Sequence, residues 1–311
     1  MSPPVVALTG ATGFVGRHLL SDLRAHGYSV RLLLRRPTDG TPEADSAVIG
    51  DLARPVNMAR ALEGVDAVVH SAGIAHAMSG RPEDDYRAVN TEATVALGRA
   101  AERAGVRRFV FLSSVRAQTG PSAEGVVDES RAPAPTDAYG RSKLAAEEGL
   151  ATLGLDWVAL RPVLVYGPGV KGNMAALVRL AASPWPLPLG GLRARRSLLA
   201  VENLAAAVRA AIVAEGPLRR AFLVADDGAW TLPEMIAALR RGLGRRPGLV
   251  PIPEPLLVLA GRAAGRGEAL ERLTGALVVD ARALRGIGWA PVVKTPDALA
   301  ALAATAAGEG A

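Results

Sequence analysis

Tyr139 and Lys143 are four residues apart in the segment Ala138–Lys143. If this segment is helical, both side chains lie on one face, so the phenol and the ammonium can point into one site. A neighbouring cation favours the ionised phenol, and we expect Lys143 to lower the pKa of Tyr139 from about 10 toward neutrality. The pair is then suited to general acid–base catalysis. The same spacing also fits an ordinary surface helix, so a catalytic role requires a cofactor nearby.

A glycine-rich turn near the start of the chain predicts such a cofactor site. Val5–Leu8 is typical of a short buried strand, and apolar residues recur at helical spacing from Phe14 onward. Gly10, Gly13 and Gly16 occupy the connection and the first turn of that helix. Glycines there let the backbone turn tightly and approach a pyrophosphate, while the helix N-terminus supplies amide hydrogens. The pattern predicts dinucleotide binding.

The end of the second predicted strand, Ser29–Leu34, indicates which dinucleotide is bound. An acidic residue at this position accepts hydrogen bonds from the adenosine ribose of NAD, whereas arginine accommodates the 2'-phosphate of NADP. Here Arg35 and Arg36 follow the strand. The sequence therefore predicts NADP(H), although NAD(H) remains possible because two solvated arginines would give the same pattern.

Strands and helices alternate through the first half of the chain, which predicts an α/β fold with a doubly wound parallel sheet. The further expected strands are Ala47–Gly50, Asp66–His70, Phe109–Leu112 and Trp157–Leu160. Ligands of such sheets bind beyond the carboxyl ends of the strands. Three pairs of residues occur at those ends: Asp51 with Leu52, Ala72 with Gly73, and Ser113 with Ser114.

The composition argues against several kinds of partner. The chain has 311 residues, 50% of them hydrophobic, and no cysteine, which excludes disulfides, iron–sulfur clusters and thiolate zinc sites. Its net charge of +6 comes from arginines scattered without aromatic residues between them, so we expect no nucleic-acid partner. The N-terminus lacks the pattern of a signal peptide, and the apolar run Leu256–Ala260 is too short to span a bilayer. We expect a cytoplasmic protein.

The four histidines have no spacing typical of a metal site, and we expect none. They are His18, His26, His70 and His76. His70 ends a predicted strand, and a structural role is expected for it.

Four motifs in order carry a family resemblance. They are Thr9–Gly16, Leu112–Ser114, Tyr139–Lys143 and Leu160–Gly169. Together they resemble the extended short-chain dehydrogenase/reductases, and more closely the NAD(P)-dependent epimerase/dehydratase branch that includes UDP-glucose 4-epimerase and nucleotide-sugar 4-reductases. The resemblance covers nearly the whole chain.

The resemblance implies a Rossmann fold with a smaller C-terminal substrate domain. The NADP-binding domain is expected over residues 1–162 with a return segment near 195–225, and the substrate domain over 163–194 and 226–311. It also implies a homodimer formed through the helix that carries Tyr139 and the helix that contains Asn90.

The resemblance further assigns site residues. It implies a catalytic triad of Ser114, Tyr139 and Lys143. The implied cofactor-binding residues are Gly10, Thr12, Gly13, Phe14, Val15, Gly16, Arg35, Arg36, Asp51, Leu52, Ala72, Gly73, Asn90, Tyr139, Lys143 and Pro162. A nucleotide-diphosphate sugar substrate is expected to contact Ser114, Asn173, Arg196 and Arg272. Asn173 has an equally good structural interpretation as a helix N-cap.

Departures from the family pattern select among its reactions. Sugar 4,6-dehydratases follow the active-site Ser or Thr with an Asp-Glu pair, but Val115 and Arg116 follow Ser114 here. The epimerases carry an acidic residue where this chain has Leu34. We therefore expect NADPH-dependent reduction of the C4 ketone of a nucleotide-linked 6-deoxy sugar, such as UDP-4-keto-6-deoxy-N-acetylhexosamine, in surface polysaccharide biosynthesis. A UDP-hexose 4-epimerase with bound NAD and a reductase of a hydrophobic ketone remain as alternatives.

Overall fold

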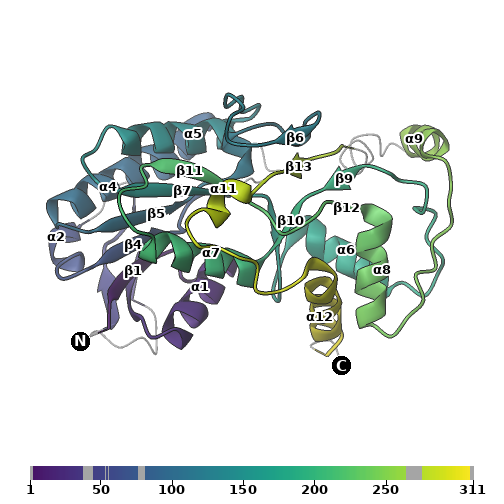
Figure 1. Cartoon of the computed structure of the whole chain (residues 1–311), viewed down its shortest axis with the longest axis horizontal. Helices are drawn as coiled ribbons and strands as arrows, with labels where there is room; N and C mark the ends of the chain where they lie inside the picture. Colours follow the sequence, from purple (N-terminus) through teal and green to yellow (C-terminus); the bar gives the residue numbers. More distant parts are fainter. Residues whose placement is uncertain are drawn as a thin grey trace.

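A seven-stranded parallel sheet forms the centre of the larger lobe in the computed structural model of this chain (Figure 1). The structure describes residues 3–37, 45–52, 54, 56–75, 81–263 and 275–308. The strands lie in the order β11-β7-β5-β4-β1-β2-β3. Their bounds are β1 Val5–Thr9, β2 Ser29–Leu34, β3 Ser46–Val48, β4 Ala67–His70, β5 Arg108–Leu112, β7 Trp157–Pro162 and β11 Arg220–Val224. This order and the parallel pairing confirm the predicted Rossmann-type α/β fold.

Helices cover both faces of the sheet (Figure 1). One face packs against α1 (Phe14–Ala25) and α7 (Val201–Val213), and the other against α2 (Met58–Ala61), α4 (Ala93–Arg103) and α5 (Ala138–Ala151). The strands are apolar on both sides, as a sheet covered on both faces requires. Each face therefore has its own hydrophobic core.

Short segments connect these elements on the carboxyl side of the sheet. They are α3 (Glu83–Tyr86), the π-helical segment η2 (Arg87–Glu92), the 3₁₀ turn η3 (Val115–Ala117), β6 (Val126–Val127), β13 (Val278–Val279) and α11 (Arg282–Arg285). Strand β6 pairs in parallel with β13, which ties the loop after β5 to a late part of the chain.

A smaller lobe lies beyond the carboxyl edge of the sheet and contains the C-terminal helix (Figure 1). Its helices are α6 (Gly172–Ala182), α8 (Leu232–Gly242), α9 (Glu254–Ala263) and α12 (Thr295–Gly308). Two strand pairs join it to the larger lobe, β8 (Leu164–Tyr166) with β10 (Leu198–Ala200) and β9 (Arg195–Arg196) with β12 (Trp230–Thr231). A third hydrophobic core fills this lobe.

Helix α8 illustrates how the sequence builds this lobe. Thr231 accepts a hydrogen bond from the amide of Glu234, and the Glu234 carboxylate accepts one from the amide of Thr231, which forms a capping box. Met235, Ile236 and Leu239 follow at helical spacing and are buried. The helix packs along α12 and α6, so the lobe is held by segments far apart in the sequence.

The predicted elements differ from the structure mainly at their ends. The third strand is shorter than the expected Ala47–Gly50, because Gly50 has a φ of +71° and the chain turns away there. The expected return segment contributes α7 and β11 to the larger lobe. The exact domain boundaries stay a prediction. No helix in the described ranges is long and apolar enough to span a membrane.

Candidate active site

The carboxyl edge of the sheet gathers most of the residues predicted to bind a cofactor. Gly10 follows β1, Arg35 and Arg36 follow β2, Asp51 and Leu52 come shortly after β3, Ala72 and Gly73 follow β4, Ser114 follows β5, and Pro162 ends β7. Because the strands are parallel, all these positions lie at one edge. Arg35, Arg36 and Asp51 are exposed there, whereas Leu52 and Pro162 are partly buried.

The turn after β1 is tightly built around its glycines. Gly10 has a φ of +73°, and a side chain on it would place Cβ 2.7 Å from the amide nitrogen of Ala72. A Cβ on Gly16 would overlap the carbonyl oxygen of Gly10. Helix α1 begins after Gly13, and among the described residues no side chain caps it. Its first amides, from Phe14 onward, are therefore available to an anion.

The segment after β4 is held by Asn90, which lies in the π-helical segment η2. Its side chain accepts a hydrogen bond from the amide of Ile74 at 2.8 Å and donates to the carbonyl of Ile74 at 3.0 Å. It also donates to Ser142 Oγ at 3.1 Å, on the helix that carries Tyr139 and Lys143. A Cβ on Gly73 would lie 2.8 Å from Asn90 Oδ1, so only glycine fits between them. Such π-helical insertions often mark functional sites.

His70, the last residue of β4, is buried and has a structural role. Its Nδ1 pairs with Thr9 Oγ1 at 2.7 Å and its Nε2 with Thr94 Oγ1 at 2.9 Å. Thr9 Oγ1 in turn accepts hydrogen bonds from the amides of Ser71 and Ala72. Burial, with a smaller effect of Lys143, lowers the pKa of His70 to about 3, so the ring stays neutral. Its partners match the expected structural role.

Ser114, Tyr139 and Lys143 converge where β5 meets α5. The hydroxyl of Ser114 hydrogen-bonds with Tyr139 and accepts the amide of Arg116 at 3.1 Å. Lys143 Nζ donates to the carbonyl of Leu112 at 2.9 Å and lies 6.0 Å from the centre of the Tyr139 ring. The four-residue spacing thus places phenol and ammonium on one side of the helix. A Cβ on Gly73 would be 3.5 Å from Lys143 Nζ, which brings the lysine to the predicted cofactor segment.

The pKa of Tyr139 shifts in the direction opposite to the sequence expectation. Burial raises it to about 12, although the ring is partly exposed. The groups that oppose this are the Ser114 hydroxyl and the Arg116 guanidinium, and Lys143 is not one of them. Burial also lowers the pKa of Lys143 to about 8. Near neutral pH Tyr139 is therefore a neutral phenol, which can donate a proton, beside a mostly charged lysine.

Helix α5 is fixed at its start by a side-chain cap. Asp137 Oδ1 accepts the amide of Gly140 at 2.7 Å. The tight packing of Gly140 against the carbonyl of Arg116 leaves no space for a Cβ. Tyr139 is therefore held in the first turn between the cap and the turn η3.

A buried ion pair fixes the same helix further along. Glu147, one turn after Lys143, accepts from Arg161 on β7 with Nη2–Oε2 at 2.5 Å, and it accepts the hydroxyl of Ser113. Arg161 also donates to the side chain of Gln118. The side chains of Arg161 and Glu147 are only 8% and 4% exposed. This network joins the helix of Tyr139 to the ends of β5 and β7.

The smaller lobe contributes a pocket of about 320 Å³ that contains both Asn173 and Arg196. Its other lining residues are Leu164, Met174, Ala176, Leu177, Leu180, Ala194, Leu198, Trp230, Leu232 and Met235. The lining is apolar apart from the two predicted substrate contacts. Asn173 does not cap its helix, because the N-cap position of α6 is Lys171, so that alternative interpretation is wrong. Arg272 lies outside the described residues.

Arg116 is a residue of the site that the motif analysis missed. Its guanidinium Nε bonds Asp137 Oδ2 at 3.1 Å, and its Nη2 contacts the same oxygen. The sequence separates the two partners by twenty-one positions, so no local pattern indicated the pair. The only feature of the sequence that could have indicated Arg116 as a site residue was its position two residues after Ser114.

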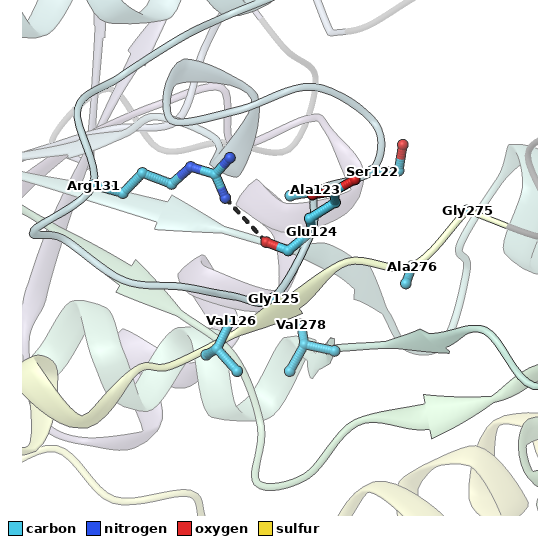
Figure 2. Close-up of a pocket in the computed structure, with 9 residues that line it drawn as sticks. All are labelled: Ser122, Ala123, Glu124, Gly125, Val126, Arg131, Gly275, Ala276 and Val278. Carbon is cyan, nitrogen blue, oxygen red and sulfur yellow. Dashed lines mark hydrogen bonds between the residues drawn. The ribbon is translucent and has the colours of Figure 1, made fainter.

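A larger hollow, of about 880 Å³, is lined by none of the predicted site residues (Figure 2). It is lined by the loop Ser122–Val126, by Arg131, and by Gly275, Ala276 and Val278. Figure 2 shows Arg131 donating to the carbonyl of Glu124, at 3.2 Å. Both charged residues are exposed, and the hollow brings together no groups suited to catalysis. Within the described ranges, no cluster of side chains could hold a metal ion.

Several known sequences match this chain over most of its length, and three of the matches are described here. The model of the NAD dependent epimerase/dehydratase family matches residues 6–225. A UDP-glucose 4-epimerase of Vibrio cholerae is 34% identical over an alignment of 302 positions, which covers 93% of this chain and 91% of that protein. A ceramide reductase of Caulobacter vibrioides is 31% identical over an alignment of 267 positions, which covers 83% of this chain and 76% of that protein.

Solved structures share the fold over almost the whole length. MoeE5 in complex with UDP-glucose and NAD is 26% identical with a TM-score of 0.73, covering 98% of this chain and 99% of that one. WbmG of Bordetella bronchiseptica in complex with NAD has a TM-score of 0.77 at 22% identity, over 99% of this chain and 96% of that one. The second likeness concerns the fold alone.

Proposed function

Because this chain belongs to the NAD-dependent epimerase/dehydratase family, we propose that it is an NADPH-dependent reductase of the C4 ketone of a nucleotide-linked sugar. A 6-deoxy sugar such as UDP-4-keto-6-deoxy-N-acetylhexosamine is the proposed substrate, in surface polysaccharide biosynthesis. The observation that carries the proposal is the convergence of Ser114, Tyr139 and Lys143 at the edge that also holds the glycine turn. Arg196 and Asn173 line the adjacent pocket.

The residues at the sheet edge fit a dinucleotide. The uncapped start of α1 offers amides to a pyrophosphate, and the glycines leave a cradle that side chains would fill. Asn90 and Lys143 would bind or position the nicotinamide half. Asp51 and Leu52 would lie near the adenine. Bound NADPH supplies the hydride for reduction of the ketone.

In the proposed reaction, side chains of this protein transfer the proton to the ketone oxygen. The hydroxyls of Ser114 and Tyr139 hydrogen-bond the ketone oxygen and polarise it. Tyr139, neutral at physiological pH because its pKa is raised, donates its proton to that oxygen as negative charge develops. The Lys143 ammonium then stabilises the tyrosinate. Arg196 holds the substrate through its diphosphate, away from the reacting carbon.

The first test is the preference for NADP(H), which we assign to Arg35 and Arg36. Replacing both with alanine should reduce the preference by about one to two powers of ten per contact, since charge-assisted hydrogen bonds are worth about 1.5 to 3 kcal/mol each. NAD affinity should change little. The measurement is parallel titration with NADP and NAD. The double change Arg99→Ala/Arg103→Ala, on the exposed side of α4, is the matched control. A wild-type protein that binds NAD more tightly than NADP contradicts the assignment.

The second test concerns Arg196. We expect Arg196→Ala to raise KM for a nucleotide-linked keto sugar about tenfold or more, with NADPH affinity unchanged, because the diphosphate loses a charge-assisted partner. Its neighbour Arg195 is exposed and donates to the carbonyl of Ala229 at 2.7 Å, so Arg195→Ala serves as control. An unchanged KM in the Arg196 variant would mean that Arg196 does not bind the substrate.

An epimerase is the second candidate function, favoured by the Vibrio cholerae relative. Such an enzyme keeps NAD bound and returns the hydride to the sugar without net reduction. Incubating the purified protein with UDP-glucose and no added cofactor separates the two. Appearance of UDP-galactose supports the epimerase, whereas consumption of NADPH with a keto sugar supports the reductase.

A third candidate function is a reductase of a hydrophobic ketone. The apolar lining of the pocket favours it, as does the similarity to the Caulobacter protein named a ceramide reductase. A thermal-shift screen in the presence of NADP, with UDP sugars and with long-chain ketones, decides between them because a bound ligand raises the melting temperature. The proposed cytoplasmic location is tested by fractionation. The proposed homodimer, through α5 and the helical segment of Asn90 (η2, which continues into α4), is tested by light scattering. Arg272 remains a proposed second phosphate contact.

A further inference from the structure

We propose that His70 is a positioning residue for the cofactor site: its imidazole, protonated at Nε2 alone, holds the segment after β4 and the segment of Asn90 in one fixed arrangement. This inference goes beyond the structural role of a buried histidine. It rests on the proposed function, because both segments belong to the predicted dinucleotide site. It is carried by an unbroken row of buried hydrogen bonds that runs from Thr9 through His70 to Asn90.

The hydroxyl of Thr9, the last residue of β1, sets the direction of the first bond. Its oxygen accepts the amides of Ser71 and Ala72, each at 3.1 Å, and these two donors occupy both of its lone pairs. The hydroxyl proton is then left for His70 Nδ1, which is 2.7 Å away. Nδ1 therefore accepts a hydrogen bond and carries no proton, so the ring is neutral and its proton is on Nε2.

The hydroxyl of Thr94, on α4, gives the same answer from the other side of the ring. It lies 2.7 Å from the carbonyl oxygen of Asn90, which can only accept, so the proton of Thr94 must be donated there. Thr94 Oγ1 can then only accept from His70 Nε2, at 2.9 Å. Thr9, His70, Asn90 and Thr94 are each at most 1% exposed. Two independent sets of partners thus require the same tautomer.

The plane of the imidazole is fixed by the neighbouring strand β5. The ring stacks on Phe111, with centroids 5.7 Å apart and 20° between the planes. Lys143 Nζ lies 4.6 Å from the centre of the same Phe111 ring. A cationic imidazole would be repelled by that ammonium, so the position suits a neutral ring, in agreement with the pKa of about 3 that burial gives His70.

Both ends of the row reach predicted cofactor residues. At one end Thr9 holds the amide of Ala72, and at the other the side chain of Asn90 binds both the amide and the carbonyl of Ile74. The segment between these two attachments is therefore ordered before a cofactor arrives. Without the bonds of His70, binding would have to order this segment, and that cost would weaken the affinity for the dinucleotide. A histidine that only fills the core would affect stability alone.

The first measurement is the tautomer, read from long-range proton–nitrogen NMR correlations of the protein with isotope-labelled histidine. The signal of His70 is assigned by its absence in His70→Phe or His70→Gln. We expect a proton on Nε2, none on Nδ1, and no titration through the neutral range, because the pKa is about 3. A proton on Nδ1 overturns the inference.

The second measurement is calorimetric titration with NADP and with NAD. His70→Phe keeps an aromatic ring but removes both hydrogen bonds, whereas Thr94→Val removes only the link toward η2. We expect the first to weaken dinucleotide binding about tenfold and the second about fivefold. Trp289→Phe is the matched control, because Trp289 is also buried and would lose its bond to the carbonyl of Asn203, at 3.1 Å. It should lower the melting temperature and leave dinucleotide affinity unchanged.

The outcomes separate this inference from the proposed function. If the wild type binds a dinucleotide and both variants bind it within about twofold, His70 serves stability alone, and the inference is wrong while the proposed function stands. If the variants lose affinity but the wild type reduces no keto sugar, the positioning role stands and the reductase falls. If the wild type binds neither NADP nor NAD, both fall. If His70→Phe does not fold, wild-type affinity in Thr94→Val overturns the inference.

Discussion

Replacing Tyr139 with phenylalanine is expected to lower kcat for ketone reduction about 10²- to 10⁴-fold, the range that general acid–base groups contribute. The change removes the proton donor while it keeps the ring, which packs against Tyr86 with centroids 6.2 Å apart. NADPH affinity should stay within about twofold, since Lys143 and the glycine turn are untouched. Stopped-flow measurement of NADPH oxidation gives kcat, and fluorescence titration gives the affinity.

Tyr86→Phe is the matched control for that variant. It makes the same chemical change at a buried ring that touches Tyr139 from the neighbouring helix α3. We expect normal kcat from it. If Tyr139→Phe also keeps normal kcat on the true substrate, another group supplies the proton and the proposed relay is wrong.

The second large effect concerns stability. Glu147→Ala leaves the guanidinium of Arg161 charged and buried without its partner, and should lower the free energy of unfolding by about 3 to 5 kcal/mol. The double variant Glu147→Leu/Arg161→Met, which removes both charges and keeps the volume, should recover most of the loss. Urea denaturation followed by circular dichroism measures both.

The exposed pair of Arg141 and Glu83 provides the comparison on the same helix. Its side chains are 48% and 59% exposed, and Arg141→Ala should cost less than about 1 kcal/mol. A loss in Glu147→Ala no larger than in Arg141→Ala would mean that water reaches the buried pair. Glu147→Ala should also lower the pKa of Lys143 further, because the charge of Glu147 opposes the lowering of that pKa by burial.

Local patterns predicted the parts of the site that local geometry determines. The strand, glycine turn and helix at the start of the chain occur as expected, because the turn depends only on residues within a few positions. The spacing of Tyr139 and Lys143 correctly indicated one helix face. The parallel sheet with helices on both faces followed from the alternation of strands and helices.

Features that depend on contacts between distant parts of the chain could not be predicted from local sequence patterns. The sign of the pKa shift of Tyr139 is set by burial, which no spacing reveals. The pairing of Arg116 with Asp137 joins a strand end to a helix cap, and that of β6 with β13 joins segments about 150 positions apart. Asn173 was misread as a possible cap because the N-cap of its helix is Lys171, two residues earlier than that interpretation requires.

The smaller lobe is completed by α12, which follows the other helices named above in the sequence. Leu299, Leu302 and Ala303 of α12 are buried in its core, against α8 and below β10. During synthesis the sheet can assemble once β11 has left the ribosome, whereas the core beside the pocket stays incomplete until α12 has left it too. A chain that stops before α12 is therefore expected to form the dinucleotide edge but not the pocket of Asn173 and Arg196, and so to bind a cofactor without a substrate.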